Sequence, residues 1–218
     1  MSGIWLRPER SGRGPEPEHD RAAIAAAGIR LADAGGLAAA SMRRVGAEIG
    51  ASAAALYRYV RTREELLELM ADAAVGELVA VPATGEWRAD LLALAREVLG
   101  LYRRHPWLLE AGRGPLGPNG LGYLEQGLAL LSPLDRPGAA KLEALGMLTG
   151  VVQLVARLEL SAGDAAQWQA DQAALVTRAV ADGAHPHLAA AVGGGSAAPE
   201  GELLDRILPR VLAGLLGA

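Results

Sequence analysis

The chain has 218 residues and a net charge of −4, and its 51% hydrophobic residues include no Phe and few other aromatic residues. This length allows one large or two small domains with a buried core, and an apolar content of mainly Ala, Leu and Val favours an all-α fold. The absence of Cys excludes disulfide scaffolds, thiolate zinc sites and cysteine nucleophiles.

The N-terminal third predicts an arm followed by short helices. Residues 1–19 hold three Arg, three Pro and three Gly and too little apolar surface to fold, which predicts a flexible arm. Ser41, Ser52 and Thr62 stand where N-caps are expected, and Thr62 to Glu65 has the spacing of a capping box. Apolar spacing and Gly breaks predict four helices, at about 20–34, 42–49, 53–59 and 63–73.

The rest of the chain predicts a larger helical region after the breaker cluster Pro82–Gly85. Residues 185–201 are rich in Ala, Gly and Pro and are expected to form a loose loop. The opening residues are too short for a signal peptide, and no uncharged apolar stretch reaches the roughly 20 residues that cross a bilayer. We therefore expect a cytoplasmic protein with no membrane partner. Helical patterns run at about 87–104, 107–112, 118–132, 136–161, 164–182 and 202–217.

Charge is distributed unevenly along the chain. Residues 1–63 hold ten Arg and six acidic residues, a net charge of +4, whereas residues 64–218 carry −8. A basic segment on an acidic body is what local contact with DNA predicts. The alternative is a compositional bias, since twenty of the 21 basic residues are Arg.

Residues 42–57 have the spacing of a helix-turn-helix. Two short predicted helices meet at a turn centred on Gly50, and Ala47 stands where the two are expected to approach closely. Such a unit presents its second helix as a ridge that fits the major groove of DNA, although the same spacing also occurs in plain helical bundles. The positions that would seal both helices against the preceding one are apolar, namely Val45, Ile49 and Leu56.

Residues 20–70 resemble the DNA-binding region of the tetracycline-repressor (TetR) family. The resemblance rests on four segments, namely Ile24–Gly36, Met42–Ser52, the run Leu56-Tyr-Arg-Tyr-Val60, and Arg63–Leu67. The region from Trp87 to Trp107 and the long helix near 136–161 resemble the family's ligand-binding domain more weakly. Beyond the arm that composition predicts at 1–19, the resemblance implies a three-helix helix-turn-helix domain at 20–66 and a larger helical effector-binding and dimerisation domain at 67–218.

The resemblance also implies which residues contact double-stranded operator DNA. By this resemblance, Arg43 contacts a base edge or a phosphate, and the tyrosines on either side of Arg58 contact phosphates. Arg63, at a helix N-terminus, binds a phosphate. Core packing is the alternative for Tyr57, and a solvated surface charge is the alternative for Arg63. The expected contacts are Arg43, Arg44, Ser52, Ala53, Ala55, Tyr57, Arg58, Tyr59 and Arg63.

The recognition helix departs from the family pattern at its centre. Ala53, Ala54 and Ala55 stand where polar residues often read bases, and Ala can touch a thymine methyl group but cannot donate a hydrogen bond. We therefore expect sequence reading to depend on the three nearby arginines, with DNA shape and the Arg-bearing arm contributing. These arginines are Arg43, Arg44 and Arg58.

Two helices, at 136–161 and 202–217, are apolar around more than one face, so they could pack inward and across a partner at once. The resemblance implies that together they form a four-helix homodimer interface, and Pro209 is expected to kink the second. The alternative is that both are core helices of a monomer. The expected interface residues are Leu148, Val151, Val155, Leu204, Ile207, Leu208, Val211 and Leu212.

The effector site is implied by resemblance to lie among the helices at 87–104, 107–112 and 118–132. We expect a largely apolar small molecule that shifts the population between two orientations of the DNA-binding domain. Each candidate contact has the alternative of being an ordinary core or surface residue. The candidates are His105, Trp107, Tyr123, Gln126, Gln153 and Arg157.

Two other classes of function compete with a DNA-binding regulator. The four His are scattered, none has metal-ligand spacing with acids, and there is no P-loop, G-x-S-x-G or dinucleotide fingerprint. We therefore expect neither a cofactor, a metal nor an enzyme activity. The Ala-rich recognition helix keeps open a second alternative, a helical adaptor of the same fold that binds a protein partner instead of DNA.

Overall fold

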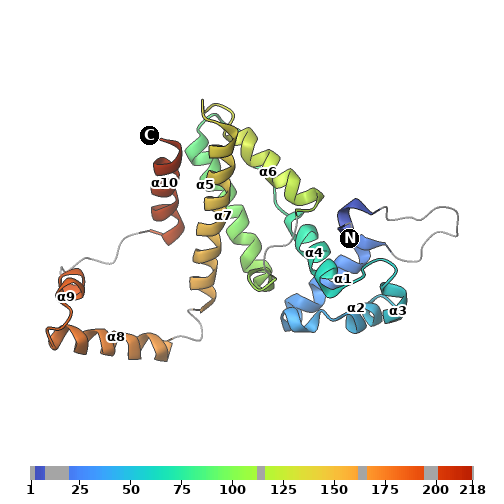
Figure 1. Cartoon of the computed structure of the whole chain (residues 1–218), viewed down its shortest axis with the longest axis horizontal. Coiled ribbons are helices and arrows are strands. Elements are labelled where there is room, and N and C mark those ends of the chain that lie inside the picture. The colour runs from blue at the N-terminus through green and yellow to red at the C-terminus, as the bar shows by residue number, and fades with distance from the viewer. Residues whose placement is uncertain (1–2, 8–19, 112–115, 162–165, 194–200, 218) are drawn as a thin grey trace.

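The computed structural model describes residues 3–7, 20–111, 116–161, 166–193 and 201–217. Its regular structure within these ranges is entirely helical (Figure 1), which confirms the all-α prediction. The elements are η1 (Ile4–Leu6), α1 (Arg21–Gly35), η2 (Leu37–Ala39), α2 (Met42–Glu48), α3 (Ala53–Leu56), α4 (Arg63–Val75), α5 (Trp87–Arg104), η3 (Pro106–Leu109), α6 (Pro118–Leu130), α7 (Gly138–Ser161), α8 (Ala166–Ala181), α9 (Pro186–Gly193) and α10 (Leu203–Leu216).

Helices α1 to α4, which we call the head, pack around one hydrophobic core. The predicted N-caps are present, because the side chains of Ser41, Ser52 and Thr62 each accept a hydrogen bond from the backbone N–H three residues later, at 3.1–3.3 Å. Leu69 and Met70 of α4 belong to the head core. The head therefore extends through α4, past the boundary expected at residue 66.

The N-terminal segment around η1 is held against the head. Ile4 is fully buried in the head core. Arg21 of α1 donates hydrogen bonds to the carbonyl oxygens of Ile4 and Arg7, at 3.1 and 3.2 Å, and Arg7 forms a 2.5 Å ion pair with a glutamate of α4. The flexible-arm prediction is wrong for residues 3–7, because Ile4 provides an apolar anchor; residues 8–19 lie outside the described ranges.

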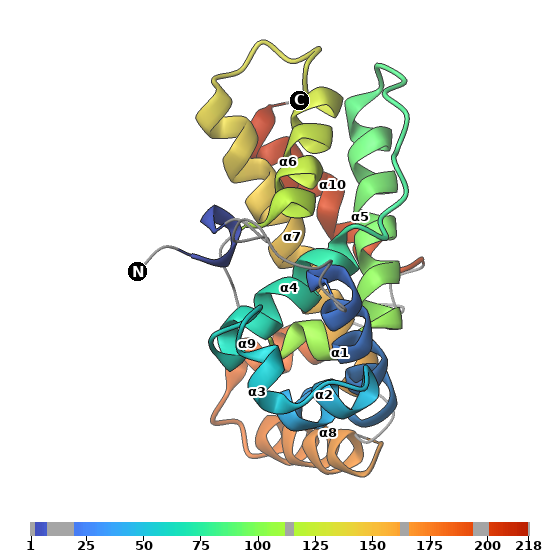
Figure 2. The same ribbon diagram turned by 90° about the vertical axis from the view of Figure 1, so that its right-hand side faces the viewer.

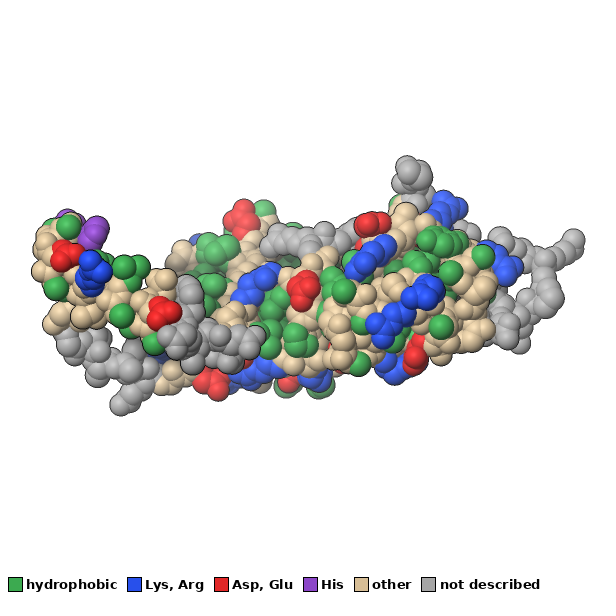
Figure 3. All heavy atoms as spheres, turned by 90° about the horizontal axis from the view of Figure 1, so that it is seen from below, with side chains coloured by type: hydrophobic (Ala, Val, Ile, Leu, Met, Phe, Trp, Pro, Cys, Tyr) green, Lys and Arg blue, Asp and Glu red, His purple; other side chains and the backbone are tan. Residues whose placement is uncertain are grey.

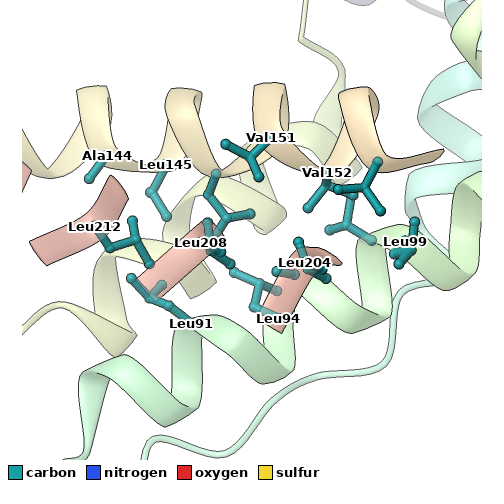
Figure 4. Packing of buried hydrophobic residues seen from close by; sticks show 14 of the residues in the cluster. Leu91, Leu94, Leu99, Ala144, Leu145, Val151, Val152, Leu204, Leu208 and Leu212 are labelled. Atoms are coloured by element: carbon teal, nitrogen blue, oxygen red, sulfur yellow. The ribbon is translucent and has the colours of Figure 1, made fainter. Parts of the chain in front are cut away.

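Helices α5, α6, α7 and α10, which with η3 we call the body, form a second core. Helix α7 packs against both α5 and α10, and their Leu and Val side chains meet between them (Figure 4). Each such side chain contributes about 1.5–3 kcal/mol when fully buried. Helix α6 packs against α5 and α7 of the body and against α4 of the head, and Figure 2 shows α4 between the other head helices and the body.

The head core is completed by residues of the body. Leu101 at the end of α5 and Trp107 of η3 are 2% exposed and belong to the head's cluster, not to the body's. Leu78 and Leu108 are partly buried and pack against both cores. The head and the body are therefore joined by these apolar contacts as well as by the packing of α4 against α6.

Helices α8 and α9, the outer helix pair, extend away from the body (Figure 1). None of residues 170–193 is buried. The loose-loop prediction for residues 185–201 is wrong for Pro186–Gly193, which form α9, because Pro at the first helical position and a run of Leu and Ala favour a helix. Residues 194–200 lie outside the described ranges.

Helix α7 is long and apolar enough to cross a membrane, by length and composition alone. Its buried face packs on α5 and α10, and 33% of the apolar 18-residue window is buried inside the protomer. Helix α10 contains the predicted Pro209 inside its span.

Six of the eight residues expected at a dimer interface are buried inside the protomer. Ile207 and Val211 are the two of the eight that remain partly exposed. The sequence could not separate inward from outward positions, because both helices are apolar around more than one face. The expectation is therefore wrong for Leu148, Val151, Val155, Leu204, Leu208 and Leu212, which are 0–8% exposed in the body core.

Candidate nucleic-acid interface and its connection to the body

The turn between α2 and α3 depends on two glycines. Gly50 adopts a positive φ of 73°, which residues with a side chain rarely adopt. A Cβ atom on Gly46 would lie 2.8 Å from the backbone oxygen of Ala51, so α2 and the turn approach each other here. The close approach expected at Ala47 is thus one residue earlier, and Ala47 itself is exposed.

Helix α3 forms an exposed ridge fixed by buried anchors. Leu56 and Val60 are at most 1% exposed and hold the ridge to the head core. Tyr57 is 51% exposed and Arg58 is also exposed, so the core-packing alternative for Tyr57 is wrong. The partly buried positions of the predicted set are Ala53, Ala55 and Tyr59.

Arginines surround this ridge. Arg43 and Arg44 are exposed on the first turn of α2, and neither they nor Arg58 form an ion pair with another described residue. Arg63, on the first turn of α4, donates a 3.2 Å hydrogen bond to the carbonyl oxygen of Leu37, which positions its exposed guanidinium. Figure 3 shows basic side chains over the head end of the molecule. The structure thus brings together a protruding helix and unpaired cations, as a DNA interface requires.

The head is joined to α6 by a buried aspartate that sequence reasoning missed. Asp72 of α4 is 8% exposed, and its carboxylate accepts hydrogen bonds from the Gly120 N–H at 2.9 Å and from the backbone and side-chain N–H groups of Asn119 at 3.3 and 3.1 Å. These N–H groups belong to the first turn of α6, where helices lack internal partners. An acid among the apolar residues of α4 was the signal that could have identified this contact.

His105 and Trp107, which were expected to contact the effector, lie at a second connection between head and body. The two ring nitrogens of His105 lie 2.8 Å from Asp33 of α1 and 2.9 Å from Glu77, which follows α4. The Trp107 indole N–H donates to Asp33 at 2.8 Å. Both side chains are buried by these contacts with the head, so they connect it to the end of α5 and to η3.

The structure brings three other predicted effector residues together between α5, α6 and α7. Tyr123 and Thr149 share a hydrogen bond of 3.1 Å, and Gln153 donates to the Tyr102 hydroxyl at 2.8 Å. Burial raises the pKa of Tyr123, so its hydroxyl stays protonated at neutral pH. Arg157 donates to the carbonyl oxygen at the end of η3. The groups of this polar cluster therefore pair with protein atoms within an otherwise apolar core.

The sixth candidate, Gln126, lies on α6 three residues after Tyr123 and is half-buried. Residues three apart on a helix share a face. Gln126 therefore lies next to the polar cluster without being a member of its hydrogen-bond network in the described structure.

Two family models match the chain. Residues 24–70 match the model described as bacterial regulatory proteins, tetR family. Residues 81–216 match the model described as tetracyclin repressor-like, C-terminal domain. The first match covers most of the head, and the second covers α5 to α10.

Individual relatives agree with both matches. The HTH-type transcriptional repressor DrrR1 of Streptomyces coeruleorubidus is 38% identical over 85% of this chain and 73% of that protein. An HTH-type transcriptional regulator of Saccharopolyspora erythraea is 34% identical over 56% of this chain and 52% of that protein. The solved structure of apo ActR from Streptomyces coelicolor aligns with a TM-score of 0.76 and 27% identity, over 93% of this chain and 97% of ActR. The chain belongs to the tetR family of bacterial helix-turn-helix transcriptional regulators.

Proposed function

We propose that this regulator is a cytoplasmic repressor without enzyme activity, which binds a palindromic operator as a homodimer and is released by a small molecule. The observation that carries the proposal is the exposed α3 ridge together with exposed arginines that form no ion pair among the described residues, on the first turn of α2 and directly after α3. Phosphate neutralisation by such arginines supplies affinity, and base-edge contacts supply specificity. Two heads are needed because one short helix reads too few base pairs for specific control.

Fluorescence anisotropy with DNA from upstream of the protein's own gene, set against scrambled DNA across a salt series, tests this function. Nanomolar binding that prefers the first DNA, with a steep salt dependence, supports the repressor. If binding is equal for both, selection from random DNA identifies any operator that lies elsewhere. Absence of specific binding to every sequence, with the oligomer intact, would favour the protein-binding adaptor.

The outer face of α7 supports the proposed homodimer. Met147, Leu154 and Leu158 are 48–52% exposed, and their spacing of seven and four residues places them on one stripe of the helix. Gly150 lies beside this stripe and allows a second helix to approach closely. Ile207 and Val211 of α10 are partly exposed next to the same core, so both helices offer apolar surface to a partner.

Replacing Leu154 by Glu is expected to convert the dimer to a monomer, because the twofold axis would place two carboxylates in one apolar interface. Sedimentation velocity measures the change in mass. Leu121→Glu is the matched control, since Leu121 is 58% exposed on α6 and is expected to leave the dimer intact. A dimer that persists in the Leu154 variant would place the interface elsewhere.

The polar cluster around Tyr123 supports an effector that has both an apolar body and hydrogen-bonding groups. The relative ActR has been solved in complex with actinorhodin, with a TM-score of 0.74 and 26% identity to this chain, and with (S)-DNPA. We take actinorhodin as the first probe for this regulator. If actinorhodin releases the protein from DNA, measured as a loss of anisotropy, an effector of this kind is supported. If it does not, effectors of other chemical classes should be tested.

A further inference from the structure

One imidazole ring joins three elements at the boundary of head and body. His105 lies between α5 and η3 and is 6% exposed. Its Nδ1 lies 2.8 Å from Oδ1 of Asp33, near the end of α1, and its Nε2 lies 2.9 Å from Oε2 of Glu77, two residues after α4. Any rotation of the head relative to α5 must therefore change at least one of these two contacts.

Each carboxylate at this joint has a second donor. Oδ1 of Asp33 also accepts the Trp107 indole N–H at 2.8 Å, and the two aromatic rings lie 6.0 Å apart. Oε2 of Glu77 lies 3.6 Å from Nε of Arg104 at the end of α5. From α7, Arg157 reaches the far end of η3 at the Leu109 carbonyl. Loss of one His105 contact therefore loosens the joint without leaving either carboxylate unpartnered.

The geometry of the ring distinguishes its two protonation states. A neutral imidazole has one N–H donor and one lone pair, whereas an imidazolium has two donors. With a carboxylate at each nitrogen, only the imidazolium makes both bonds, and the neutral ring turns a lone pair toward an anion. Burial by itself lowers the pKa of His105, but the hydrogen bonds and negative charges of Asp33 and Glu77 outweigh burial and raise that pKa above its ordinary value of 6.5.

We propose that His105 is a protonation-controlled joint that tightens the connection between the DNA-binding head and α5 when the ring is charged and loosens it when the ring is neutral. The folded state binds this proton more tightly than the unfolded chain does. The contribution of charged His105 to the stability of the folded state is therefore complete below pH about 6.5. It is lost as the pH rises through the pKa that His105 has in the folded state. This pH input goes beyond the proposed function, because it acts on the head without an effector.

Nuclear magnetic resonance of the full chain tests the joint without DNA or effector. The chain has four His and four Trp, and the His105→Gln and Trp107→Phe variants assign the two signals of interest. We expect the His105 ring to titrate with a midpoint above 6.5 and the Trp107 indole N–H to move with the same midpoint. A midpoint at or below that value, or an indole signal that does not respond, overturns the proposal.

A second variant allows the proposal to be tested even if the His105→Gln variant does not fold. Glu77 is partly exposed, so Glu77→Gln is expected to fold and to shift the His105 midpoint downward. His187→Gln, on exposed α9, is the control and is expected to leave the midpoint unchanged. An unchanged midpoint in Glu77→Gln contradicts the bridge.

The orientation of the head is measured directly by electron paramagnetic resonance. Because the chain has no Cys, single cysteines in place of exposed Ala47 on α2 and Leu121 on α6 carry two spin labels, and tenfold dilution with unlabelled protein isolates the distance within one chain. We expect the distance distribution to broaden as the pH rises through the His105 midpoint. A distribution that is identical at all pH values overturns the proposed role of the joint.

Discussion

Replacing both Arg43 and Arg58 by Ala is expected to remove most of the discrimination between operator and scrambled DNA. The central positions of α3 are alanines, and Arg43 and Arg58 are, with Arg44, exposed arginines near this helix in the chain. A bidentate arginine–guanine contact contributes about 1–3 kcal/mol, and a dimer makes each contact twice. The expected loss is thus at least about 30-fold for each arginine, measured by anisotropy as the ratio of the two dissociation constants.

Two matched variants separate base reading from charge. Arg30→Ala removes the same charge from the head, but Arg30 lies on α1 and pairs with Glu48, so discrimination is expected to be unchanged. Arg63→Ala is expected to weaken binding to both DNAs equally and to reduce the salt slope, as a phosphate contact does. If the Arg43 and Arg58 variants retain full discrimination, shape readout and not direct contact determines the operator.

Replacing Asp72 by Ala is expected to lower the free energy of unfolding by about 2–3 kcal/mol, because it removes the acceptor of three hydrogen bonds and leaves the buried Gly120 N–H unpaired. The same change is expected to reduce the effect of actinorhodin on operator affinity toward onefold, since α4 and α6 no longer move together. Urea denaturation measures the first effect, and anisotropy with and without actinorhodin measures the second.

A double-mutant cycle with Asn119→Ala separates the contact from other effects of either change. The two substitutions together should destabilise the protein by clearly less than the sum of the single effects, because both remove the same hydrogen bonds. Additive effects would show that Asp72 acts through something other than α6. If the Asp72 variant loses stability but its operator affinity still responds normally to actinorhodin, the contact between Asp72 and α6 only stabilises the fold. The effect of the ligand on the head must then pass through other residues.

Local signals in the sequence predicted most of the helices, although not α9, and separation along the chain explains the contacts that they missed. The start and end of α5 were predicted correctly, because Trp87 follows a Pro and Gly cluster and His105 precedes a Pro. The caps at Ser41, Ser52 and Thr62 act within three residues, so they too were predicted. Periodicity alone also identified the two apolar helices of the body, although not which of their faces point inward.

The contacts between head and body could not be predicted in this way. Asp33 and His105 are 72 positions apart, and Asp72 and Asn119 are 47 apart. A single sequence contains no signal that pairs such distant residues, so His105 was expected to contact the effector because of its neighbourhood in the chain. The anchoring of Ile4 was missed for the same reason, since its partners lie on α1 and α4.

The head core contains two side chains from beyond its own segment, Leu101 and Trp107. A chimaeric regulator made by joining the head of one relative to the body of another would therefore separate residues that pack together, wherever the cut falls between α4 and α5. An exchange that keeps the core intact must also transfer the end of α5 and η3, Leu101–Leu109. Tyr102 and Leu109 within that stretch belong to the body core and are bound by Gln153 and Arg157 of α7, so the transferred stretch must also match the body that receives it.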